Sequence, residues 1–323
     1  GSEMCIRDSH TIEGVSGVCC MSLYPHIDDL LELRHQAHTL GLASHHLVNS
    51  TFSGLYASVF RGTGLDFEEV REYREGDDIR NMEWNVTART NIPHMKIFRE
   101  ERERSVILCI DKGPHMSFGT RGTFKSIQAA KAAALLGWAA SRLNDRVGGI
   151  LFGDAGTGMQ YFRPTKDRRA LWLLLHSLTS EGSPEKRQID SLSEALQRAD
   201  RGTATGSLIF VIADMNREIA SLEQTLGRLT QHHTLVLLPV DDPADREIPD
   251  MGQVAFTSPD GEIVEIDTRN EQARTRYREV WQQRREVLSL MSSRLRIPLM
   301  PIGTEEEIHQ ALTRGLARNF GRR

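Results

Sequence analysis

The sequence of 323 residues has few cysteines, no long hydrophobic run and no excess of basic residues. Its four cysteines form neither a C-x-x-C motif nor a paired disulfide framework, which indicates a reducing compartment, and we expect the protein in the cytoplasm. No run of about 18 apolar residues occurs, so no membrane span is predicted. The net charge of −4 argues against sequence-independent binding of nucleic acid, which needs a basic surface.

The first residues also lack the basic-then-apolar order of a signal peptide. Gly1 and Ser2 are typical of a cloning scar, and Met21 stands just before the first periodic segment. We therefore expect residues 1–23 to be an unstructured or non-native leader.

Residues 24–103 predict an N-terminal helix and a small β-rich subdomain. Apolar residues recur at helical spacing over 27–48, and strands are expected at 55–60 and 94–99. Between these strands, the segment 64–89 combines carboxylates, arginines, a tyrosine and a tryptophan with weak periodicity. Such a segment cannot build a core alone, so we expect its charges to pair with one another or with a partner. A later predicted hairpin over 254–267 is a candidate addition to this subdomain.

Residues 104–323 predict a doubly wound, mostly parallel α/β sheet of the Rossmann-like class, followed by C-terminal helices. Buried strand patterns alternate there with amphipathic helix patterns, as expected when helices cover both faces of a sheet. The expected strands are 106–110, 147–152, 208–214 and 234–240, with a hairpin partner at 158–162; the expected helices are 123–143, 167–178, 191–199, 219–229, 270–291 and 305–316.

Carboxylates follow two of these buried strands. Asp111 and Asp214 each end a strand, and Asp190 precedes a helix that would begin near the same edge. Ligand sites in open α/β sheets lie beyond the carboxyl ends of the strands, and oxygen ligands suit Mg²⁺. A site for a hard cation and a purely structural role, in which these carboxylates cap helices or bind loop amides, both stay open from the sequence.

This layout resembles the von Willebrand factor type A domain, which holds a metal with a D-x-S-x-S motif after the first strand, a loop threonine and a later aspartate. The resemblance implies a degenerate form of that site here, composed of Asp111, Asp190 and Asp214 with His115. Gly113 and His115 stand at the two serine positions, and Asp190 falls on or near the threonine position. Glycine offers no side-chain oxygen, and a histidine nitrogen matches Mg²⁺ poorly.

The segment before the first buried strand resembles the signature of the bacterial "domain of unknown function 58" family. That signature is R-x-Y-x-x-G-D-D-x-R-x-I-x-W-x-x-x-A-R, placed just before a von Willebrand type A-like domain, and the resemblance covers roughly residues 24–240. It implies a partner, a MoxR-type AAA+ ATPase, and a role as its adaptor or co-chaperone in protein maturation or metal insertion. The matching residues are Arg71, Tyr73, Gly76, Asp77, Asp78, Arg80, Trp84, Ala88 and Arg89.

Each signature residue has a structural and a functional interpretation. The arginines either clamp a phosphate or carboxylate of a partner or pair with Asp77, Asp78 and Glu83 in a structural network. Trp84 is either an interface hot spot or a residue packed against the sheet domain.

The sequence therefore favours a non-catalytic protein–protein interaction module, with the rim around Asp111, His115, Asp190 and Asp214 as the first expected contact surface. A metal-dependent hydrolase, using the rim carboxylates or the pair Asp77 and Asp78, is the alternative. A purely structural scaffold is the third interpretation.

Overall fold

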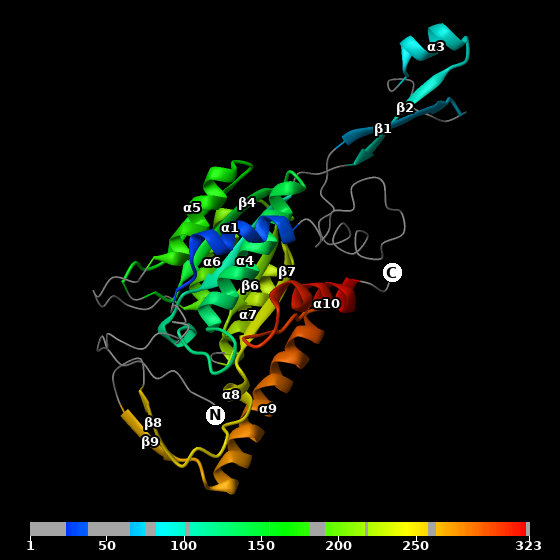
Figure 1. Cartoon of the computed structure of the whole chain (residues 1–323). Helices are drawn as coiled ribbons and strands as arrows, with labels where there is room; N and C mark the ends of the chain where they lie inside the picture. The colour runs from blue at the N-terminus through cyan, green and yellow to red at the C-terminus, as the bar shows by residue number, and fades with distance from the viewer. Residues whose placement is uncertain are drawn as a thin grey trace.

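The structure is a computed structural model of the whole chain, and it describes residues 24–37, 65–74, 82–100, 104–154, 156–180, 191–216, 219–257 and 263–320. A six-stranded sheet with helices packed against it forms the body of the molecule (Figure 1). Its strands are β3 (Ser105–Asp111), β4 (Arg146–Phe152), β5 (Gln160–Thr165), β6 (Leu208–Ala213), β7 (Thr234–Asp241) and β10 (Ile302–Gly303).

The strand order of this sheet is β10-β7-β6-β3-β4-β5. All neighbouring pairs are parallel except β4 with β5. Renumbered from β3, the order is 3-2-1-4-5-6, the doubly wound arrangement with its topological switch point between β3 and β6. The predicted mostly parallel α/β fold is therefore confirmed, with an antiparallel strand at one edge.

Both faces of the sheet are buried, because helices cover each of them. Successive residues of a central strand point to opposite faces. On β3, Leu108 packs in the core beneath α1, α4, α5 and α10, whereas Ile107 and Cys109 pack beneath α6, α7 and α9. The helix bounds are α1 (Ile27–Gln36), α4 (Lys125–Arg142), α5 (Arg168–Thr179), α6 (Leu192–Gly202), α7 (Ile219–Leu229), α9 (Glu271–Arg294) and α10 (Ile308–Phe320).

The elements of residues 104–320 that sequence patterns missed are short. The strand β10 has two residues, the helix α8 (Pro243–Arg246) has four, and a 3₁₀ turn spans Pro114–Met116. Such lengths hold about one helical turn or one strand period at most, so no periodicity can indicate them. The described part of α1 ends at Gln36, and the remainder of the helix expected over 27–48 lies largely outside the described residues.

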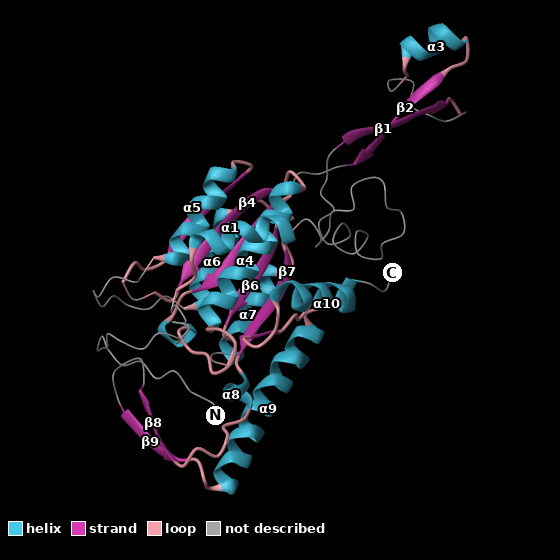
Figure 2. Ribbon diagram, in the orientation of Figure 1, coloured by secondary structure: helices cyan, strands magenta, loops and turns pink. Residues whose placement is uncertain are grey.

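The segment 64–89, which weak periodicity left without regular structure, contains a strand and a helix. The strand β1 (Leu65–Glu72) pairs antiparallel with β2 (His94–Glu100), and α3 (Trp84–Thr90) lies between them in the chain (Figure 2). A carboxylate oxygen of Glu83 accepts the N–H of Asn85 and caps α3, and Asn91 ends it with a positive φ of 57°. These local caps explain a helix too short to show a pattern. The strand expected at 55–60 lies outside the described residues.

The hairpin of β8 (Gln253–Thr257) and β9 (Ile263–Asp267) forms a two-stranded sheet of its own. It does not pair with β1 and β2, so the idea that it extends their sheet is wrong. It precedes the first turn of α9, which runs from there back to the body of the molecule (Figure 1). Across the described residues, no helix has both the length and the apolar character that a bilayer crossing requires.

Candidate functional site

The carboxylate of Asp111 lies at the carboxyl end of β3, as predicted, and only 5% of the residue is exposed. Its Oδ1 accepts the N–H of Gly113 at 2.8 Å, and its Oδ2 lies 2.9 Å from Nε2 of His115. The backbone closes around it: a Cβ built on Gly153, whose φ is +84°, would lie 2.8 Å from Oδ1 of Asp111. Both oxygens of this carboxylate are therefore engaged within a tight shell.

Asp214 directly follows β6, the strand that pairs with β3. Its Oδ1 accepts the N–H of Asn216 at 2.9 Å, and its Oδ2 accepts a hydrogen bond from Nζ of Lys125 at 2.8 Å. Lys125 is the first residue of α4 and is only 1% exposed. The ammonium also contacts Oδ2 of Asp245 in α8 at 2.6 Å. One buried cation thus joins the start of α4, the end of β6 and α8.

The charges of this group shift one another. Burial alone would lower the pKa of Lys125, but the adjacent carboxylates of Asp214 and Asp245 outweigh it and raise that pKa. Burial acts to raise the pKa of Asp214, yet the ammonium and the Asn216 amide hold it below its ordinary value. For Asp245 burial prevails, and its pKa is raised. The lysine is therefore held in its charged form.

Other carboxylates at this edge also have ionic or hydrogen-bond partners within the protein. Nζ of Lys112 lies 3.7 Å from Oδ2 of Asp154, just after β4. The buried carboxylate of Asp242, after β7, accepts hydrogen bonds from the hydroxyls of Thr120 and Thr304. We call Asp111, His115, Lys125, Asp214 and Asp245 the rim cluster.

The rim cluster does not fit a divalent cation of the kind that the type A resemblance implies. Each oxygen of Asp111 and Asp214 already faces a donor, and the position of the first serine is Gly113, which has no side-chain oxygen. Hard cations such as Mg²⁺ and Ca²⁺ generally need about six or more free oxygen ligands at roughly 2.0–2.6 Å. Within the described ranges, no group of three or more His, Cys, Asp or Glu side chains has an arrangement suited to a metal. Asp190 lies outside the described residues, so its predicted part in a metal site stays a prediction.

The signature residues that the structure describes lie on β1, just after it at Tyr73, and on α3. Nη1 of Arg71 donates to the carbonyl of Glu72 at 2.9 Å, and the N–H of Tyr73 donates to the carbonyl of Pro93. Trp84 is 66% exposed, so the interpretation in which it packs against the sheet domain is wrong. Arg89 is exposed in the last turn of α3. The remaining signature residues, Gly76, Asp77, Asp78 and Arg80, lie outside the described residues.

Sequence reasoning missed Lys125 and Asp245. Lys125 was included only as one residue of an Ala-rich helix, and a lysine at a helix N-terminus is unfavourable for the dipole. That mismatch was the available signal, because a cation at the positive end of a helix needs a nearby carboxylate. Nothing in the pattern around Asp245 indicates its role, since α8 has only four residues.

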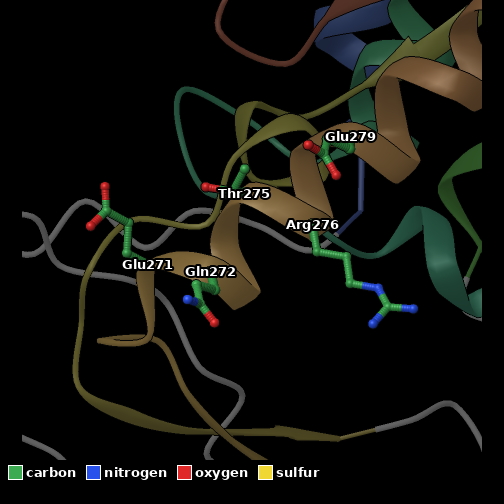
Figure 3. A pocket seen from close by; sticks show the side chains of 5 residues that line it. All are labelled: Glu271, Gln272, Thr275, Arg276 and Glu279. Atoms are coloured by element: carbon green, nitrogen blue, oxygen red, sulfur yellow. The ribbon is translucent and has the colours of Figure 1, made fainter.

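A hollow on the exposed side of α9 is lined by residues of that helix alone (Figure 3). The side chains of Glu271 and Arg276 point away from each other and do not converge on a common point. We assign no site to this hollow. It is lined by Glu271, Gln272, Thr275, Arg276 and Glu279.

Solved structures similar to this chain include type A domains. The conserved hypothetical protein BatB from Bacteroides thetaiotaomicron is 17% identical, with 67% of this chain and 98% of that chain covered at a TM-score of 0.40. The SpRpn10 VWA domain is 12% identical, with 65% and 93% covered at a TM-score of 0.39. The strand order and directions described above, and not these similarities, define the fold of the chain.

Sequence relatives include the uncharacterized proteins Rv1480 of Mycobacterium tuberculosis (strain H37Rv) and Mb1516 of Mycobacterium bovis. Each is 26% identical over 226 residues, which is 70% of this chain and 70% of the relative. A family model matches residues 69–287, which include the described signature residues, the rim cluster and most of α9. Because this match covers more than half of the sequence, the chain belongs to the family described as "Protein of unknown function DUF58".

Proposed function

We propose that this protein is a non-catalytic protein–protein interaction module, and that its partner is a MoxR-type AAA+ ATPase for which it acts as an adaptor or co-chaperone in protein maturation or metal insertion. The partner class comes from the family resemblance of the signature segment. The observation that carries the interaction role is the exposure of Trp84 on α3.

An exposed tryptophan is a candidate contact residue for a partner. Trp84 is 66% exposed, and Ile92, just after α3, is 46% exposed. Tryptophan is among the residues most enriched at interface hot spots, because it buries a large rigid area at a low entropic cost. We call Trp84 and Ile92 the α3 surface, and we propose it as the contact surface for the ATPase.

The rim cluster is a poorer contact surface than the sequence led us to expect. Asp111 and Lys125 are 5% and 1% exposed, so a partner would reach the surrounding loops before either side chain. The hydrolase alternative needs carboxylates that are free to hold a metal. Both oxygens of Asp111 and of Asp214 instead face donors within the protein.

The test is a binding titration between the purified protein and a MoxR-type ATPase of the same organism, with and without ATP. We expect Trp84→Ala to weaken binding by roughly tenfold or more, in line with hot-spot tryptophans. Trp172→Ala is the matched control, because Trp172 is also exposed, at 39%, but lies on α5.

Wild-type protein that binds no such ATPase in either nucleotide state would contradict the proposed partner. Equal effects of Trp84→Ala and Trp172→Ala would contradict the proposed surface.

A further inference from the structure

We propose that the ammonium group of Lys125 is the resident cation of this sheet edge and replaces the divalent metal that the type A resemblance implies. The inference goes beyond the proposed partner and does not depend on it. It rests on the position, the contacts and the burial of one side chain.

The position is at the carboxyl ends of the two central strands. Asp111 ends β3 and Asp214 follows β6, and these neighbouring strands flank the topological switch point. A cation at such a point would draw on the carboxylates that the two strands deliver to it. Lys125 reaches Asp214 from the start of α4, and His115 faces Asp111.

The contacts leave little for a metal to coordinate. The ammonium has three N–H groups, and carboxylate oxygens of Asp214 and Asp245 lie 2.8 and 2.6 Å from its nitrogen. A metal bound here would have to displace the ammonium from Asp214 and His115 from Asp111. The displaced ammonium would then be buried without its partners, which is costly for a charge.

Burial separates this arrangement from an adhesion site. A metal with an open coordination position can accept an acidic side chain from a partner, whereas the Lys125 side chain is only 2% exposed and is already held by two carboxylates. The ammonium therefore acts as a permanent internal tie between β6, α4 and α8. It follows that this edge of the sheet keeps its structure without divalent cations and is insensitive to chelators.

The first experiment measures binding of Mn²⁺ alone by electron paramagnetic resonance of the free ion, on the full-length wild type. We expect no stoichiometric tight binding and no change in Tm between Mn²⁺ and a chelator. One tightly bound Mn²⁺ that Asp214→Asn or Asp111→Asn abolishes would overturn the inference.

The second experiment removes the resident cation. Lys125→Ala and Lys125→Gln leave Asp214 and Asp245 without the ammonium, and we expect them to gain one Mn²⁺ and a rise in Tm with the ion. The gain should be lost again in Lys125→Ala combined with Asp214→Asn. Lys131→Ala, on the same helix, is the control and should gain no Mn²⁺ site.

A folded Lys125→Ala protein that gains no Mn²⁺ would show that the ammonium does not occupy a cation position, and it would overturn the inference. Should both lysine variants fail to fold, the wild-type titration decides alone. The result is also independent of the ATPase, because failure of the Trp84 experiment leaves the Mn²⁺ outcomes unchanged.

Discussion

The ammonium nitrogen of Lys125 lies 2.8 Å from a carboxylate oxygen of Asp214, although the two residues are 89 positions apart in the sequence. Their side chains are 2% and 7% exposed. The pair joins the first residue of α4 to the residue after β6, and Asp245 of α8 completes it. Three elements that meet at the carboxyl edge of the sheet thus share a single buried charge interaction.

Removing Lys125 should destabilise the protein strongly. Breaking a buried pair by deleting one partner leaves an uncompensated charge and costs about 3–5 kcal/mol. We expect the free energy of unfolding of Lys125→Ala to fall by about that amount, measured by urea denaturation in chelator. Lys131→Ala, a half-buried position on α4, should lose well under half as much. Equal losses in the two variants would show that the pair with Asp214 contributes nothing specific.

His233 should make the protein less stable as the pH falls through the neutral range. Burial lowers the pKa of His233 from its ordinary 6.5, and the nearby Asp200 offsets this only in part. Its Nε2 lies 3.4 Å from Oδ1 of Asp200, whereas its buried Nδ1 has no hydrogen-bond partner among the residues that the structure describes. Below about pH 6.5 the unfolded chain binds a proton that the folded chain does not yet bind, so the free energy of unfolding decreases.

The variant His233→Gln removes this proton linkage. We expect its Tm to decline less than that of the wild type between about pH 7.5 and pH 5.5, measured by thermal unfolding. His232→Gln is the comparison, because the adjacent, exposed His232 is the smallest of the causes that lower the pKa of His233, so its removal should flatten the profile much less than His233→Gln does. A His233→Gln profile parallel to that of the wild type would show that His233 does not carry the linkage.

Cys109 should be unreactive while the protein is folded. Burial raises the pKa of its thiol to about 12, so almost no thiolate is present near neutral pH. Iodoacetamide at about pH 8 should leave the peptide that contains Cys109 unmodified in the native protein and modify it fully in urea, as read by mass spectrometry. Rapid modification under native conditions would mean that β3 opens far more often than a central strand of a buried sheet should.

The sheet was predictable because its pattern is local and long. The strands β3, β6 and β7 are near-continuous apolar runs, and the next long elements after β3 and β6 are the helices α4 and α7. The order of the strands follows from the connection rules for doubly wound sheets. The short strand β10 was missed because its pairing with β7 depends on contacts across the fold rather than on its own two residues.

The site was predictable only in its carboxylates. Asp111 and Asp214 follow buried strands, so their place at one edge was visible in the sequence. The cation that pairs with Asp214 was not visible, because Lys125 comes from α4, a separate element far away in the sequence. Asp245 of α8, the second partner of that lysine, was hidden for the same reason. The signature residues Arg71 and Trp84 were identified by resemblance, and the exposure of Trp84 became known only with the structure.

The glycine at position 148 should be intolerant of any side chain. A Cβ built there would lie 2.6 Å from the carbonyl oxygen of Phe162 on the antiparallel strand β5 and 2.7 Å from the backbone nitrogen of Pro164. Backbone atoms cannot turn aside as a flexible side chain can, so the two strands would have to separate. We expect Gly148→Ala to lower the free energy of unfolding by about 1–3 kcal/mol, the usual cost of overpacking, as measured by urea denaturation.

Gly227→Ala is the matched control. Among the described residues, a Cβ at Gly227, inside α7, would meet only Cδ2 of Leu295 at 3.6 Å, an ordinary van der Waals contact. Alanine is favoured over glycine in a helix interior by about 1 kcal/mol, so this variant should be as stable as the wild type or more stable. If Gly148→Ala were also neutral, the close approach of β5 to β4 would not be a constraint on the fold. The opposite signs expected for one added methyl group therefore test the packing of the antiparallel edge directly.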